Sequence, residues 1–220
     1  MDSLAEVTAE IVECRACPRL VAWREQVARE KRAAFRTDEY WGRPVPGFGD
    51  PKARLLVVGL APAAHGGNRT GRVFTGDRSG DWVFGALHRA GYANQPTSER
   101  ADDGLRLTGA YVAAAVRCAP PANKPTPEER DRCVGYLDRE IALLTDVRVV
   151  VVLGQFAHDV MCRRFGVRPK PRFGHGVEAD SGGGRTLIAS YHPSQQNTFT
   201  GTLTEAMFDA IFTRARELTG

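Results

Sequence analysis

Short apolar runs alternate with longer stretches of mixed polarity along most of this 220-residue chain. Four of the short runs are apolar without alternation, which predicts strands that are covered on both faces. These strands are residues 54–58, 111–116, 147–153 and 186–190. Amphipathic spacing predicts helices at residues 3–12, 20–34, 79–90, 126–144, 155–165 and 203–218. The order of these elements predicts an α/β fold with three layers, α/β/α, around a parallel sheet.

Capping residues mark two of the helix starts. Ser3 and Glu6 have the spacing of a capping box at the first helix. At the second start, Thr126 is followed by Pro127 and by Glu129 at the third position. The helix predicted at residues 20–34 is basic on its outer face. We expect one domain over residues 1–220, with a helical N-terminal part at residues 1–50.

The loop after the first predicted strand carries most of the reactive side chains. Gly59 ends the strand, and residues 60–77 are too rich in Gly and Pro to form a helix or strand. Open α/β sheets bind ligands at the carboxyl ends of their strands, where this loop begins. Its reactive side chains are His65, Arg69, Arg72, Phe74 and Asp77. Core packing needs none of them, so the loop predicts a functional site.

A second loop follows the fourth predicted strand and opens at the same edge of the sheet. It begins at His192 and continues with Ser194, Gln195, Gln196 and Asn197, whose side chains suit hydrogen bonds to phosphates or to a base. A lone histidine at such a position is more often structural. Its place opposite Phe74 and Asp77 nevertheless predicts a binding pocket.

Charge favours a polyanionic partner. The net charge of the chain is +4, and residues 14–54 contain ten Lys or Arg against five Asp or Glu. A basic segment beside a polar crevice is typical of a nucleic-acid binder. A basic face that only contacts solvent would have the same composition.

Composition excludes a membrane span, because the chain has no run of about 18 apolar residues. The first twelve residues include Asp2, Glu6 and Glu10 and lack the basic, apolar pattern of a signal peptide. We therefore expect a cytoplasmic protein.

The cysteines predict a metal site. Cys14 and Cys17 form a Cys-x-x-Cys pair, Cys118 follows a predicted strand and Cys133 lies early in the next helix. In a cytosolic protein this set favours a structural zinc or an iron–sulfur cluster over disulfides, and spacing does not choose between the two metals. Four unrelated buried cysteines are the remaining alternative. Cys162 lies within a predicted helix and is interpreted as a small core residue.

Three blocks of sequence resemble the uracil-DNA glycosylase superfamily, and specifically its family 5 of bacteria and archaea. The blocks are residues 59–63 continuing through 71–77, residues 117–125 and residues 192–198. The resemblance implies a four-stranded parallel sheet and removal of uracil and other deaminated or adducted bases from double-stranded DNA. It also implies a [4Fe–4S] cluster of structural role, with Cys14, Cys17, Cys118 and Cys133 as its ligands.

Under this resemblance the predicted catalytic residues are Asp77, near the sugar, His192, as a donor to the departing base, and Asn123, as a polar contact to base or water. The predicted base-pocket residues are Gly59, Leu60, Ala61, Pro62, Ala63, His65, Phe74 and Ala114, with Phe74 as the stacking platform and main-chain N–H groups of residues 60–63 as donors. The predicted DNA contacts are Arg69, Arg72, Lys124, Ser194, Gln195, Gln196 and Asn197.

Two positions depart from the better-known members of the superfamily. Those members have an acidic residue where this chain has Leu60, and an asparagine where it has Ala114. Because this chain lacks these polar groups, we assign catalysis to Asp77. For the same reason we expect the protein to discriminate only weakly between bases. We expect a monomer associated with the nucleoid. The alternative is a non-enzymatic iron–sulfur or zinc module that binds nucleic acid, in which Asp77 and His192 would tolerate substitution.

Overall fold

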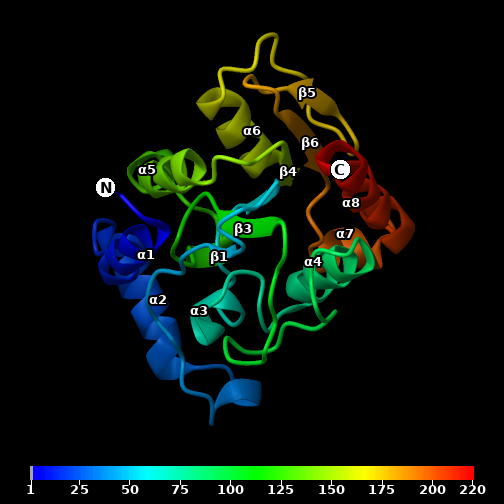
Figure 1. Cartoon of the computed structure of the whole chain (residues 1–220). Helices are drawn as coiled ribbons and strands as arrows, with labels where there is room; N and C mark the ends of the chain where they lie inside the picture. Colours follow the sequence, from blue (N-terminus) through cyan, green and yellow to red (C-terminus); the bar gives the residue numbers. More distant parts are fainter. Residues whose placement is uncertain (1) are drawn as a thin grey trace.

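The computed structural model describes residues 2–220 and contains one six-stranded sheet, in the order β1-β3-β2-β4-β6-β5 (Figure 1). The strands are β1 (Phe48–Gly49), β2 (Leu55–Gly59), β3 (Ala110–Ala114), β4 (Val149–Leu153), β5 (Glu178–Asp180) and β6 (Thr186–Ser190). The four central strands β3, β2, β4 and β6 are parallel, which confirms the expected parallel sheet. The edge strands β1 and β5 pair antiparallel with β3 and β6, so the complete sheet is mixed and has two more strands than expected.

The helices form a layer on each face of the sheet. The main helices are α1 (Leu4–Glu13), α2 (Pro18–Glu30), α4 (Arg78–Arg89), α5 (Pro127–Leu143), α6 (Gln155–Arg164) and α8 (Glu205–Thr219). Alternate residues of β2 enter opposite cores. Leu55 and Val57 pack in the core that holds side chains of α4 and α8, and Leu56 and Val58 pack in the core that holds side chains of α5 and α6. The predicted three layers are therefore confirmed.

Short elements escaped the sequence pattern. They are α3 (Gly67–Thr70), α7 (Gln195–Phe199) and the 3₁₀ turns at Ala33–Phe35 and Pro121–Asn123. Both short helices lie in loops predicted to be irregular, and one or two turns are too short to show a helical period. The predicted caps are present, because Ser3 accepts from the N–H of Glu6, and Thr126 and Glu129 form a complete capping box.

The two functional loops leave the same edge of the sheet. Gly59 at the end of β2 pairs in register with Ala114 at the end of β3, and Leu153 at the end of β4 pairs with Ser190 at the end of β6. Residues 60–77 and 191–204 therefore begin at the same edge of the sheet, at the carboxyl ends of two parallel strands that are separated by β4. Within residues 2–220, none of the helices is long and apolar enough to cross a membrane.

Candidate active site and cysteine pocket

Phe74 lies against the end of β2. A Cβ atom at Gly59 would stand only 2.5 Å from Cζ of Phe74, so the ring occupies space that only glycine leaves free. Phe74 is 8% exposed and shares a buried cluster with Ala114. Its backbone has a φ of 50°, a left-handed conformation that costs a non-glycine residue about 1–3 kcal/mol. The surrounding loop therefore holds Phe74 in an unfavourable backbone conformation.

Asp77 is the N-cap of α4. Its Oδ1 accepts a hydrogen bond from the N–H of Gly80 at 3.0 Å. The carboxylate also packs against Gly66, where a Cβ atom would stand 1.9 Å from Oδ2. Burial raises the pKa of Asp77, while the N–H groups of Gly80 and Ser79 act to lower it. The main chain thus fixes one oxygen of a partly desolvated carboxyl.

His192 faces the same region. Its ring centroid lies 6.4 Å from that of Phe74, with 37° between the ring planes. Burial lowers the pKa of His192 to about 4, so the imidazole is neutral near pH 7. Nδ2 of Asn197 donates to the carbonyl of His192 at 2.8 Å. Oγ of Ser79 donates to the carbonyl of Pro193 at 3.0 Å, which joins the His192 loop to the start of α4.

The segment that joins β2 to α3 presents main-chain donors. The N–H groups of Ala61 and Ala63 donate to no acceptor within residues 2–220. Pro62 has no N–H group, and the carbonyl of Leu60 accepts from Val116 at 2.9 Å. His65 is engaged through Nδ1 with the hydroxyl of Tyr40 at 3.0 Å. Desolvation by burial is the main cause that lowers the pKa of His65.

Two arginines predicted to contact DNA are engaged inside the protein. Arg72 is 4% exposed, pairs with Asp103 at 2.7 Å and bonds Thr75, Ser98 and Ala101. This corrects the prediction for Arg72, because a buried and fully occupied guanidinium group cannot reach a phosphate. Arg69 pairs with Asp38 at 2.7 Å and donates to two carbonyls of the loop, so it too holds the loop together.

The remaining predicted residues lie outside this pocket. Asn123 and Lys124 are exposed in the turn before α5, with a φ of 56° at Asn123. No hydrogen bond within residues 2–220 joins the Asn123 side chain to Asp77 or His192. Ser194 caps α7 by accepting from the N–H of Asn197. Gln195 and Gln196 are exposed on α7, as predicted contacts with DNA require.

Sequence reasoning expected residues 195–199 to insert into or follow the DNA groove and did not single out the aromatic side chain of α7. Phe199 is 67% exposed, and the guanidinium group of Arg78 lies 4.4 Å from its ring centroid. Arg78 directly follows Asp77, so this pair lies next to a predicted catalytic residue along the chain. An aromatic residue in a polar, Gln-rich segment was the available signal.

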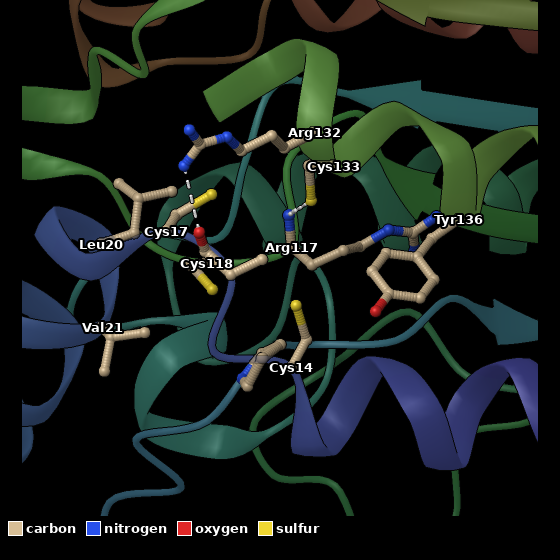
Figure 2. Close-up of a pocket in the computed structure, with 11 residues that line it drawn as sticks. Cys14, Cys17, Leu20, Val21, Arg117, Cys118, Arg132, Cys133 and Tyr136 are labelled. Atoms are coloured by element: carbon tan, nitrogen blue, oxygen red, sulfur yellow. Dashed lines mark hydrogen bonds between the residues drawn. The ribbon is translucent and has the colours of Figure 1, made fainter. Parts of the chain in front are cut away.

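Figure 2 shows the four cysteines around a common space, between the α1–α2 turn, the end of β3 and the first turns of α5. The N–H of Arg117 donates to Sγ of Cys133 at 3.2 Å. Nη1 of Arg24 donates to Sγ of Cys118 at 3.0 Å. Burial raises the pKa of Cys118 to about 11 and that of Cys133 to about 12. Burial thus favours the neutral thiol form of both cysteines.

No group of three His, Cys, Asp or Glu side chains within residues 2–220 is placed to hold a single metal ion. A structural zinc would need its four sulfur atoms at about 2.3 Å from one point. The four cysteines share a pocket without meeting at one point. Cys162 is buried in α6, with Sγ 3.4 Å from Nε2 of His158, and belongs to the core, as expected.

Comparisons with known proteins identify the family of this chain. Residues 46–216 match the family described as the Uracil DNA glycosylase superfamily. A Type-5 uracil-DNA glycosylase of Mycobacterium bovis is 57% identical over 99% of this chain and 82% of its own length. Those of Thermus thermophilus and Pyrobaculum aerophilum are 54% and 45% identical, over 96% and 93% of this chain and 95% and 88% of their own lengths. With its sheet, its paired loops and these relatives in agreement, the chain belongs to the uracil-DNA glycosylase superfamily.

Proposed function

We propose that this protein is a DNA-repair glycosylase that hydrolyses the N-glycosidic bond of uracil and other deaminated or damaged bases in double-stranded DNA and leaves an abasic site. The observation that carries the proposal is the convergence of Phe74, Asp77 and His192 at one edge of the sheet. The names of the relatives, Type-5 uracil-DNA glycosylase, support the same activity. Such a protein would act as a monomer on the DNA of the cytoplasmic nucleoid.

The target base must leave the duplex before its glycosidic bond can be reached. Phe74 offers a ring on which the flipped base stacks. As the bond breaks, negative charge develops on the base, and the neutral imidazole of His192 donates a hydrogen bond to the uracil O2. A neutral imidazole suits this task. Its N–H group keeps its proton and donates a hydrogen bond to the negative charge that develops on the base. The free N–H groups of Ala61 and Ala63 lie on the same loop and add donors.

Positive charge develops on the sugar in the same step. Asp77, held by the N–H of Gly80, supplies a fixed negative charge that stabilises the cation and orients the attacking water. Fixing the carboxylate beforehand avoids the cost of orienting it during the reaction. Asn123, exposed in the turn before α5, contributes a polar contact to the base or to water when DNA is bound.

Base selection is loose in this pocket. Leu60 and Ala114 are apolar at the positions where the better-known members of the superfamily carry polar groups. A pocket without paired polar readers rejects a wrong base only weakly, by about 1–3 kcal/mol for each small group. Shape and stacking on Phe74 then set the range of excised bases.

DNA contacts come from the exposed face of α7 and from the turn before α5. Gln195, Gln196 and Lys124 are exposed there and track the DNA backbone. Phe199 fills the gap left by the flipped base, because proteins that open a base step insert an exposed apolar wedge. Arg78 stacks on this ring and sets its direction.

The cysteine pocket holds a [4Fe–4S] cluster through Cys14, Cys17, Cys118 and Cys133. The fit rests on the lining of the pocket, which holds four cysteines and no carboxylate, and on the donation from Nη1 of Arg24 to Sγ of Cys118, so the pocket favours a centre of net negative charge. When bound, the cluster cross-links three segments that are far apart in the sequence. No hydrogen bond within residues 2–220 joins the cysteines to Phe74, Asp77 or His192, which fits a structural role.

The decisive test is excision from labelled duplexes that carry one uracil, hypoxanthine or ethenocytosine. We expect the wild type to excise uracil and Asp77→Asn to lose about 100-fold or more in the single-turnover rate. Asp81→Asn, in the exposed first turn of the same helix, is the matched control and should retain the rate. A wild type that carries its metal and excises no base would favour the nucleic-acid-binding alternative.

A further inference from the structure

Arg24 is a buried cation without an acidic partner. It lies on α2, is 2% exposed and ranks among the largest fully buried side chains. Within residues 2–220 no carboxylate forms an ion pair with it, whereas the other buried arginines pair with acids, Arg72 with Asp103 and Arg117 with Glu140. An unpaired buried charge costs several kcal/mol. The fold retains Arg24, so another negative group must offset its charge.

The contacts of Arg24 identify that group. Nη1 donates to Sγ of Cys118 at 3.0 Å, and Nη2 donates to the carbonyl of Cys14 at 3.2 Å. Its Nε is buried and has no hydrogen-bond partner within residues 2–220. Two nitrogen atoms of the guanidinium group therefore contact cysteines that line the pocket, where the thiolates of a bound metal centre would supply negative charge next to Arg24.

We propose that Arg24 is the internal counter-cation of the metal centre and sets its reduction potential through the hydrogen bond to Cys118. This inference rests on the proposed cluster, in which four thiolates outweigh the positive charge of the iron–sulfide core. Hydrogen bonds to the sulfur atoms and nearby positive charge both raise the reduction potential of such a cluster. The side chain of Arg24 supplies both the hydrogen bond and the positive charge. Its charge also offsets the net negative charge of the buried cluster.

Other cations near the cysteines are less suited to this role. The charge of Arg117 is offset by Glu140, and its contact with Cys133 comes from the main-chain N–H. Arg132 is exposed and donates to the carbonyl of Ala16. Arg24 is thus the cation that is both buried and unbalanced.

The experiment compares the loaded wild type with Arg24→Gln and Arg24→Lys by electrochemical titration, and measures metal loss to a chelator. Arg24→Gln removes the charge and should lower the potential by about 59 mV or more, a tenfold change for a one-electron couple, and should speed the loss of metal. Arg24→Lys keeps the charge and should lie between the two. Arg29→Gln, exposed on the same helix, should match the wild type.

The outcomes separate a charge role from simple packing. An unchanged potential and unchanged metal retention in Arg24→Gln would overturn the proposal. If Arg24→Gln cannot be loaded, retention of metal by Arg24→Lys supports the charge role, and equal loss from both variants overturns it. Iron and sulfide analysis of the wild type tests the cluster separately, so failure of that cofactor is distinguishable from failure of Arg24.

Discussion

The Phe74 ring packs so closely on Gly59 that a Cβ atom there would stand 2.5 Å from Cζ. The end of β2 thereby fixes the ring proposed to stack on the flipped base. Gly59 thus links the parallel sheet to substrate binding.

Replacing Gly59 with alanine should push the ring out of position. The Phe74 backbone has a φ of 50°, and its ring is packed in a buried cluster, so the ring has little freedom to move without loss of packing. Overpacking of this kind costs about 1–3 kcal/mol, and we expect weaker base binding, read as a raised KM for a uracil-containing duplex. Gly135→Ala is the control, because a Cβ atom there meets nothing within 4 Å in α5. A KM in Gly59→Ala equal to that of the control would contradict the stacking role.

His192 should make stability fall with acidification. Its pKa is about 4 in the folded protein and 6.5 without burial. Between these values the unfolded chain binds a proton that the folded chain refuses, so unfolding becomes easier as the pH falls from 6.5 towards 4. In His192→Asn, the melting temperature should fall less over this range. His88→Asn, at an exposed position of α4, should keep the wild-type pH profile. Parallel profiles for wild type and His192→Asn would rule out the neutral buried imidazole.

The sequence pattern predicted the parts of the molecule that depend on long regular runs. Val149–Leu153 has an uninterrupted apolar run, and such runs predicted the four parallel strands and their order with the helices. β5 was missed because its three residues, Glu178–Asp180, are partly exposed and carry two acids. Edge strands of this kind resemble loops in sequence. The parallel strands and the layers therefore followed from the pattern, and the sheet edges did not.

The site was predicted by residue type, and its internal contacts were not. Spacing brought Phe74, Asp77 and His192 to one edge of the sheet, because strand ends meet there. The fates of individual arginines depended on tertiary contacts. Arg72 was expected at DNA and is buried with Asp103, and Arg24 was counted only in the basic segment of residues 14–54 and is buried. A sequence shows the charge of an arginine and does not show the partner that will bury it.

The burial of Arg72 predicts a stability role. Arg72→Met would leave Asp103, whose pKa is held at about 2, without its cation. Breaking a buried pair from one side costs about 3–5 kcal/mol, measured as the change in the free energy of unfolding. The exposed pair of Arg100 with Asp102 provides the control, because Arg100→Ala should cost at most about 1 kcal/mol. If Arg72→Met kept the wild-type stability and reduced the salt dependence of DNA binding, the prediction that Arg72 contacts a phosphate would be correct after all.

Phe199 should matter only when the base has to leave a duplex. A side chain that is 67% exposed contributes little to folding, so Phe199→Ala should unfold like the wild type. Opening a base step costs a few kcal/mol, and a single-stranded base is already unstacked. We therefore expect excision of uracil from duplex DNA to fall by about tenfold or more, and excision from single strands to change much less.

Two comparisons decide whether Phe199 acts as a wedge. Phe199→Leu keeps an apolar side chain and should restore most of the duplex activity, as an apolar wedge requires. Gln196→Ala, exposed on the same short helix, controls for loss of a general contact and should reduce both substrates alike. Equal losses on duplex and single strands in Phe199→Ala would show that the ring binds DNA without filling the gap. The duplex-to-single-strand ratio of rates is thus the quantity to measure, because it isolates the cost of base flipping from overall affinity.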